Sequence, residues 1–158
     1  MALNRRVLVD LIAMLVVILI GMVGYKLSPL LMPEASVRVM PDPGCDLNRG
    51  ACQVSLPDGG RIELSVGPRP IPLVAPLRIE LRVEGAAPRR VAADFAGVGM
   101  SMGLNRPRLT ASAGGLWVGE TSLPVCITGQ MTWEVTVLLE RRGERIAVPF
   151  RFQSQDHA

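Results

Sequence analysis

The most regularly patterned stretch of the chain beyond its N-terminal region is residues 77–84, which read LRIELRVE. Apolar and charged residues alternate at every position, so the four apolar side chains share one face of an extended chain. Strict alternation of this kind is typical of a half-buried β-strand and does not fit an amphipathic helix. This stretch therefore predicts a domain built from β-strands.

The same pattern recurs on both sides of residues 77–84, in short runs separated by turn signals about every ten residues. Turns are predicted at Pro57–Gly60, Ala113–Gly115 and Arg141–Glu144. Strands are predicted at residues 51–56, 61–66, 77–84, 91–95, 106–112, 116–121, 132–140 and 145–152, with Phe150 and Phe152 pointing inward. Seven or eight antiparallel strands predict an all-β fold, an immunoglobulin-like antiparallel β-sandwich over residues 45–153.

One segment inside this domain breaks the alternation. Residues 67–76 contain four prolines, and a segment so rich in proline cannot form a central strand. We expect an extended crossover between the two sheets here. A partner-binding surface is the alternative interpretation.

A long apolar segment precedes the β-rich domain. Between Val7 and Tyr25 the only charged residue is Asp10, and ~20 apolar residues at about 1.5 Å each span a bilayer core of ~30 Å. We therefore expect a transmembrane helix over residues 7–27. A Pro-rich connector over residues 28–44 and a C-terminal tail over residues 154–158 complete the predicted organisation.

The flanking charges predict how this helix is oriented. Arg5 and Arg6 precede the apolar run, so the positive-inside rule places residues 1–6 in the cytoplasm and the C-terminal domain in the periplasm, at a bacterial inner membrane. The alternative is a cleaved signal peptide, whose apolar region covers about 7–15 residues and ends in a small-residue cleavage site. The run here is longer and lacks such a site, which favours the anchor. With either an anchor or a signal peptide, the C-terminal domain is exported from the cytoplasm.

The charge of the domain argues against nucleic-acid binding. The chain carries a formal charge of +3, most of it contributed by residues in or beside the apolar segment. Beyond residue 30 the chain is close to neutral, and its arginines are scattered among carboxylates. Nucleic-acid-binding domains carry a basic stripe or patch instead.

The chain has three cysteines. In an oxidising compartment Cys45 and Cys52, which enclose six residues, are candidates for a local disulfide. Pairings of Cys126 with Cys45 or with Cys52 remain open. If the local pair forms, Cys126 is buried and inert, bound to a metal, or used in thiol exchange.

The main candidate site lies around Met100 and Met102. One residue separates them, so on a strand they share a face, and nearby glycines predict a bulged or irregular edge. Thioether and thiolate groups are soft ligands that favour Cu(I), so Met100, Met102 and Cys126 form a candidate copper site, with Met131 as a further donor. The alternative is that the methionines fill gaps in the core. His157, the one histidine, lies in the tail and is not counted as a ligand.

Three short sequences resemble the FixH/YtkA-like envelope proteins. They are MSMG at Met100–Gly103, GLWVG at Gly115–Gly119 and GQMTW at Gly129–Trp133, and the resemblance covers about residues 77–140 plus the apolar segment. It implies one membrane helix, a small exported β-sandwich, and a role near the assembly of haem-copper oxidases or in periplasmic copper handling. The resemblance extends to Met100 and Met102 as ligands, whereas Cys126 is assigned from its chemistry.

The sequence does not predict an enzyme. It has no Cys-x-x-Cys, no Gly-rich phosphate loop after a strand, and no histidine outside its last residues. Asp94 is expected to make a strand-end hydrogen bond rather than act as a catalytic carboxylate. We expect an accessory protein for respiratory oxidase biogenesis that binds or passes Cu(I). The alternative is a metal-free structural subunit that joins a larger inner-membrane complex through its helix and β-domain.

Overall fold

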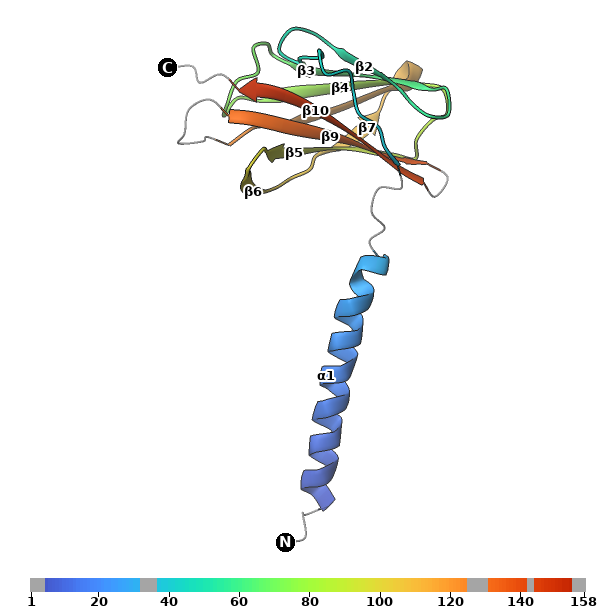
Figure 1. Cartoon of the computed structure of the whole chain (residues 1–158), viewed down its shortest axis with the longest axis vertical. Coiled ribbons are helices and arrows are strands. Elements are labelled where there is room, and N and C mark those ends of the chain that lie inside the picture. Colours follow the sequence, from blue (N-terminus) through green and yellow to red (C-terminus); the bar gives the residue numbers. More distant parts are fainter. Residues whose placement is uncertain (1–4, 32–36, 125–130, 142–143, 155–158) are drawn as a thin grey trace. The chain divides into compact units, whose positions relative to one another are not determined.

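The computed structural model describes residues 5–31, 37–124, 131–141 and 144–154. The chain divides into two compact units, Met1–Glu34 and Ala35–Ala158. The first unit contains the helix α1 and the second contains the strands of the described residues (Figure 1). Each unit is described separately.

Helix α1 runs from Arg5 to Leu31. Its segment Arg5–Tyr25 contains an 18-residue window with a mean hydropathy of 2.8, and by length and composition this one helix could cross a membrane. The helix extends four residues beyond the predicted end at Leu27 and includes Pro29. A proline removes one amide donor from a helix. Pro29 lies in the final turn, and the helix continues to Leu31 despite the missing hydrogen bond.

The described part of the second unit contains ten strands and one short 3₁₀ turn, η1. The strands are β1 (Val37–Arg38), β2 (Cys52–Ser55), β3 (Arg61–Gly67), β4 (Leu77–Glu84), β5 (Arg90–Gly97), β6 (Met100–Asn105), β7 (Arg108–Ala111), β8 (Leu116–Thr121), β9 (Met131–Arg141) and β10 (Glu144–Ser154), with η1 at Ala113–Gly115. Hydrogen bonds connect them in the order β1-β10-β9-β5-β7-β8-β4-β3-β2, and β6 pairs with β5 beside this path. The β1–β10 pair is parallel and the other pairs are antiparallel.

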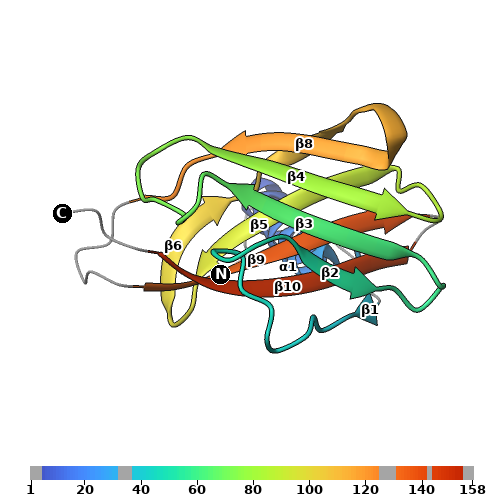
Figure 2. The same cartoon turned by 90° about the horizontal axis from the view of Figure 1, so that it is seen from above.

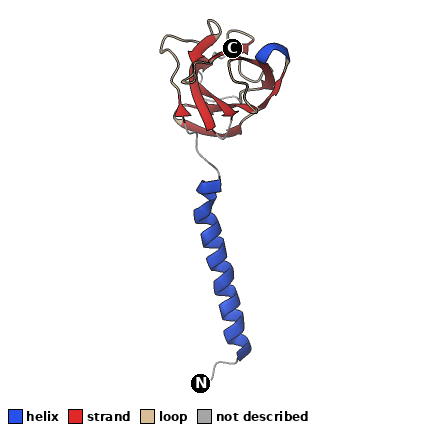
Figure 3. Ribbon diagram, turned by 90° about the vertical axis from the view of Figure 1, so that its right-hand side faces the viewer, coloured by secondary structure: helices blue, strands red, loops and turns tan. Residues whose placement is uncertain are grey.

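The prediction of an all-β domain is confirmed, but the strands do not divide into two separate sheets. Strand β7 pairs with β5 at Val91↔Leu109 and with β8 at Thr110↔Val118. This short strand joins the two halves into one mixed sheet, which curls so that its strands surround a common interior (Figures 2 and 3). The finer prediction of an immunoglobulin-like sandwich with seven or eight strands therefore differs from the observed topology.

The interior is formed by the alternating apolar residues of the strands. In β4 the apolar positions Leu77, Ile79 and Leu81 are fully buried, and the burial alternates with that of the charged residues between them. Strand β9 alternates in the same way along its full length. The inward orientation predicted for Phe150 and Phe152 is confirmed, since they are 1% and 3% exposed. Burial of each such side chain contributes about 1.5–3 kcal/mol.

Two segments without regular alternation are part of the domain. Val37 pairs with Ile146 of β10, so the sheet begins inside the segment predicted as a connector. The backbone of Val37 and Arg38 forms a strand here because it pairs with the edge of β10. Residues 68–76 link β3 to β4, which are antiparallel neighbours. The predicted crossover between sheets is therefore wrong, and the segment is a long hairpin loop that inserts Ile71 into the core.

Candidate functional site

The two candidate methionines lie in an irregular hairpin formed by β5 and β6. Gly97 pairs with Met100, which leaves Val98 and Gly99 as a two-residue connection, and Gly99 has a φ of +83°. A positive φ at the second central residue of such a turn is one that glycine adopts without strain. We call residues 97–105 the β6 hairpin.

The predicted irregular edge is confirmed by the pairing of this hairpin. The next pair after Gly97↔Met100 is Phe95↔Asn105, so two steps along β5 correspond to five along β6, and the register shifts between them. Gly103, inside this interval, has a φ of +80°. The extra residues of a bulge are unpaired and bend the strand away from its neighbour. Met100 and Met102 therefore belong to a strand that is only loosely joined to the sheet.

Both ends of the β6 hairpin are held by hydrogen bonds. The Val98 amide donates to the Thr132 carbonyl oxygen at 2.9 Å, next to the start of β9. At the other end, Asn105 Nδ2 donates to the Ser122 carbonyl oxygen at 2.9 Å, and Thr121 Oγ1 donates to Asn105 Oδ1 at 2.7 Å. Two apolar side chains of the hairpin are accessible: Val98 is 44% exposed and Leu104 is 80% exposed.

The structure places only part of the predicted copper site. Met100 and Met102 are both in β6, whereas Cys126 lies outside the described residues, so a cluster of the three sulfurs stays a prediction. Met131 is 8% exposed at the start of β9 and packs in the core. Within the described ranges no group of three or more His, Cys, Asp and Glu residues is arranged to hold a metal ion. A Cu(I) site here would have to rely on thioether and thiol sulfur, which are suitable soft ligands.

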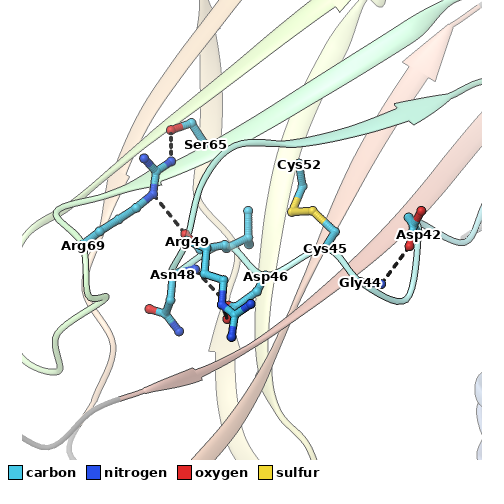
Figure 4. Close-up of a disulfide and its surroundings, with 10 residues drawn as sticks. Asp42, Gly44, Cys45, Asp46, Asn48, Arg49, Cys52, Ser65 and Arg69 are labelled. Atoms are coloured by element: carbon cyan, nitrogen blue, oxygen red, sulfur yellow. Dashed lines mark hydrogen bonds and ion pairs between the residues drawn. A yellow bond between two sulfur atoms is a disulfide. The ribbon is translucent and has the colours of Figure 1, made fainter.

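The predicted local cysteine pair is confirmed. Cys45 and Cys52 lie at disulfide-bonding distance with their Cα atoms 5.8 Å apart (Figure 4), a spacing within the normal range for a disulfide. Cys52 begins β2 and is 1% exposed. The pair joins an irregular segment to the sheet, and it leaves neither sulfur free to pair with Cys126.

Residues 39–51, which precede β2, form a leading segment with many fixed contacts. Asp46 Oδ1 accepts a hydrogen bond from the Asn48 amide at 3.0 Å, and Leu47 is fully buried in the core. Asn48 reaches two other elements: its Nδ2 donates to the Gln153 carbonyl oxygen at 2.8 Å, and its Oδ1 accepts from the Ile71 amide at 2.9 Å. The segment therefore connects β10 with the loop between β3 and β4.

Asp94 has a structural partner. It lies within β5 and its Oδ2 is 2.6 Å from Nη2 of Arg106. Both side chains are partly accessible to solvent. Asp94 was expected to form a hydrogen bond at a strand end, and it instead forms an ion pair from the middle of β5.

One buried charge was not anticipated from the sequence. The Arg141 side chain is 7% exposed, forms an ion pair with Asp58 in the β2–β3 turn, and donates to the Ala86 carbonyl oxygen at 3.2 Å. It holds together the turns at the end of the domain opposite the β6 hairpin. No sequence signal distinguishes Arg141 from the arginines beside it, because its partners are 83 and 55 residues away.

Comparison with known proteins identifies no family. No protein family model matches the chain, and no curated protein is similar to it. An engineered protein of known structure is 18% identical over 65% of this chain and 21% of its own, with a TM-score of 0.46. A DUF4785 family protein from Legionella pneumophila is 14% identical over 61% of this chain and 28% of its own, with a TM-score of 0.43. The matched region thus spans less than a third of either solved chain.

Proposed function

We propose that this chain is a membrane-anchored periplasmic accessory protein for the biogenesis of respiratory haem-copper oxidases, and that it binds or passes Cu(I) through Met100, Met102 and Cys126. It acts without catalytic residues of its own. The resemblance of its Met-x-Met-Gly and tryptophan motifs to FixH/YtkA-like proteins supports the assignment to oxidase assembly.

Two features support the membrane location. Helix α1 has the length and hydropathy to cross a bilayer, and Arg5 and Arg6 at its start favour a cytoplasmic N-terminus. The Cys45–Cys52 pair fits an oxidising compartment such as the periplasm, because disulfides rarely persist in the cytosol.

The observation that carries the copper proposal is the position of the Met-x-Met sequence in β6. A regular, fully paired strand would fix both methionines in a rigid pleat. In β6 the register shift and Gly103 loosen the pairing around Met102, and bulges of this type are often found beside functional sites. A loosely held edge lets sulfur ligands adjust to the low coordination number of Cu(I).

A Cu(I) titration of the full-length protein in detergent, against a chromophoric competing chelator, tests the proposal. We expect stoichiometric binding in the unaltered protein and its loss in Met100→Leu/Met102→Leu and in Cys126→Ser. Leucine matches methionine in volume, so the β-domain should stay folded. Met40→Leu is the control, since Met40 is an exposed methionine (71%) that lies outside the β6 hairpin. Absence of submicromolar binding by the unaltered protein would refute the copper role.

The exposed apolar residues of the β6 hairpin favour a second candidate, a metal-free accessory subunit of a larger inner-membrane complex. Val98 and Leu104 are accessible on the hairpin and suit a protein contact. In this case Val98→Ser/Leu104→Ser should abolish comigration with the oxidase complex on native gels, while the copper content of that complex stays unchanged. Loss of copper from the complex in the same variant would favour the first candidate.

A further inference from the structure

A groove with a volume of about 860 Å³ lies between the leading segment, the loop after β3 and the ends of β9 and β10. Its charged lining residues are one aspartate, Asp46, and three arginines, Arg49, Arg69 and Arg151. The three arginines come from three separate elements and converge only in the folded domain. Positive charge therefore exceeds negative charge in this groove, although the domain as a whole is close to neutral.

Each of these arginines is positioned by a contact that leaves donors available. Arg69 Nε donates to the Leu47 carbonyl oxygen at 3.0 Å, and its Nη2 donates to Ser65 Oγ at 2.6 Å (Figure 4). Both contacts are with neutral groups, so they hold the guanidinium without neutralising its charge. Because a guanidinium carries five N–H donors, Arg69 retains donors for a ligand.

The other two arginines are accessible. Arg49 Nε lies 3.7 Å from Asp46 Oδ2, and the Arg49 side chain is 89% exposed. Arg151 Nε lies 3.0 Å from Glu134 Oε2, and its side chain is 66% exposed. Exposed ion pairs of this kind are weak, so an incoming carboxylate can compete with either acidic partner.

The walls of the groove are fixed before any ligand arrives. The Asn48 side chain bonds to the backbone of Gln153 on one side and of Ile71 on the other. The Cys45–Cys52 pair holds the leading segment to β2. A groove whose walls are already ordered loses less conformational entropy when a ligand binds.

We propose that this arginine groove binds an acidic, extended peptide segment of a partner protein. Arginine matches carboxylates in a forked, two-bond geometry, and three arginines suit several carboxylates in succession. The volume is within the range of pockets that bind organic ligands rather than single ions. Thr132 and Gln153 add neutral side chains that can form hydrogen bonds with a peptide backbone. This assignment is independent of copper binding and goes beyond the proposed function.

The test is a binding measurement on the full-length protein in detergent. The probe is a fluorescein-labelled peptide of alternating glutamate and glycine, about six residues long, which spans roughly 20 Å when extended. Fluorescence anisotropy at low salt should show saturable binding, and a matched glutamine–glycine peptide should not bind. The double variant Arg49→Gln/Arg151→Gln should weaken binding about tenfold, because two charge-assisted contacts are lost.

A second double variant, Arg78→Gln/Arg90→Gln, controls for total charge. Arg78 is 66% exposed with its Nε 2.7 Å from Glu80, and Arg90 is 83% exposed beside Glu140. These arginines match Arg151 and Arg49 in exposure and pairing but lie outside the groove, so binding should change less than about twofold, the size of a general charge effect. Equal losses in the two double variants would overturn the proposal. Inorganic phosphate binding as tightly as the peptide would also overturn it, in favour of a small-anion site.

Discussion

The leading segment (residues 39–51) and the β6 hairpin (residues 97–105) are both irregular in sequence, yet the domain uses them in opposite ways. In the leading segment Leu47 is fully buried, Asn48 bonds to two other elements, and the Cys45–Cys52 pair anchors the chain. In the β6 hairpin the anchoring hydrogen bonds are at the ends, and the side chains of Val98 and Leu104 are accessible.

This difference separates irregular backbone that stabilises the fold from irregular backbone that is available for binding. Residues 39–51 close one side of the curled sheet beside β10, and their removal would expose the core. The side chains of Val98 and Leu104 in the β6 hairpin are exposed, so these two positions can change at small cost to stability. Function that tolerates or needs an adaptable backbone is therefore expected at the hairpin.

The largest expected difference between the two regions is in their leucines. Leu47→Ala should lower the free energy of unfolding by about 2–5 kcal/mol, because it leaves a cavity in the core. Leu104→Ala should change it by less than about 0.5 kcal/mol, since Leu104 is 80% exposed. Urea unfolding of the full-length protein in detergent, followed by the fluorescence of Trp117 and buried Trp133, measures both. Similar losses in the two variants would break the comparison.

The cysteine pair should have the next largest effect. Cys45→Ala/Cys52→Ala should lower the free energy of unfolding by about 2–3 kcal/mol, the chain-entropy value for so short a loop. Reduction of the unaltered protein should lower the free energy of unfolding by a similar amount. The Cys126→Ala variant should lose as much on reduction as the unaltered protein does, because Cys126 is not part of the pair. The same urea measurement with and without dithiothreitol tests this, and an unchanged midpoint on reduction would contradict it.

The smallest expected effect concerns two glycines with open space around them. A Cβ at Gly99 or at Gly50 would meet no atom within 4 Å, but Gly99 has a φ of +83° and Gly50 has no positive φ. Gly99→Ala should therefore cost about 1 kcal/mol through backbone strain alone. Gly50→Ala should be neutral or stabilising by up to about 1 kcal/mol. Thermal unfolding of the two variants in parallel distinguishes them, and equal midpoints would show that the turn at Gly99 relaxes.

Most strands could be predicted because their burial follows local alternation. Residues 77–84 and 116–121 were predicted with the bounds that β4 and β8 have, and the hairpin turn at Pro57–Gly60 was predicted as well. Strand β1 was missed because a two-residue strand has no period, and it forms only because β10 offers an unpaired edge. The sequence also did not predict that β7 joins the two halves of the sheet. The pattern of a four-residue strand does not indicate that it pairs with one strand on each side.

The candidate sites also differ in whether neighbouring residues or residues far apart in the chain form them. The local cysteine pair and the irregular β6 edge were predicted, because short spacing and glycine content are local properties. The arginine groove was not, because Arg49, Arg69 and Arg151 are separated by 20 and 82 positions and look like ordinary surface charges in the sequence. Arg141 was not predicted as a buried charge either, because its partners are 83 and 55 residues away.

The sequence by itself determined the apolar helix and the β-strand composition of the domain, and it predicted Cys45 with Cys52 as one of three possible pairings, since periodicity and short chain separation act over a few residues. Tertiary structure alone decided that the strands form one curled sheet, that residues 39–51 contribute Leu47 to its core, and that three distant arginines share a groove. Those features depend on contacts between segments far apart in the chain, and the free energy of such contacts is not encoded in any single stretch.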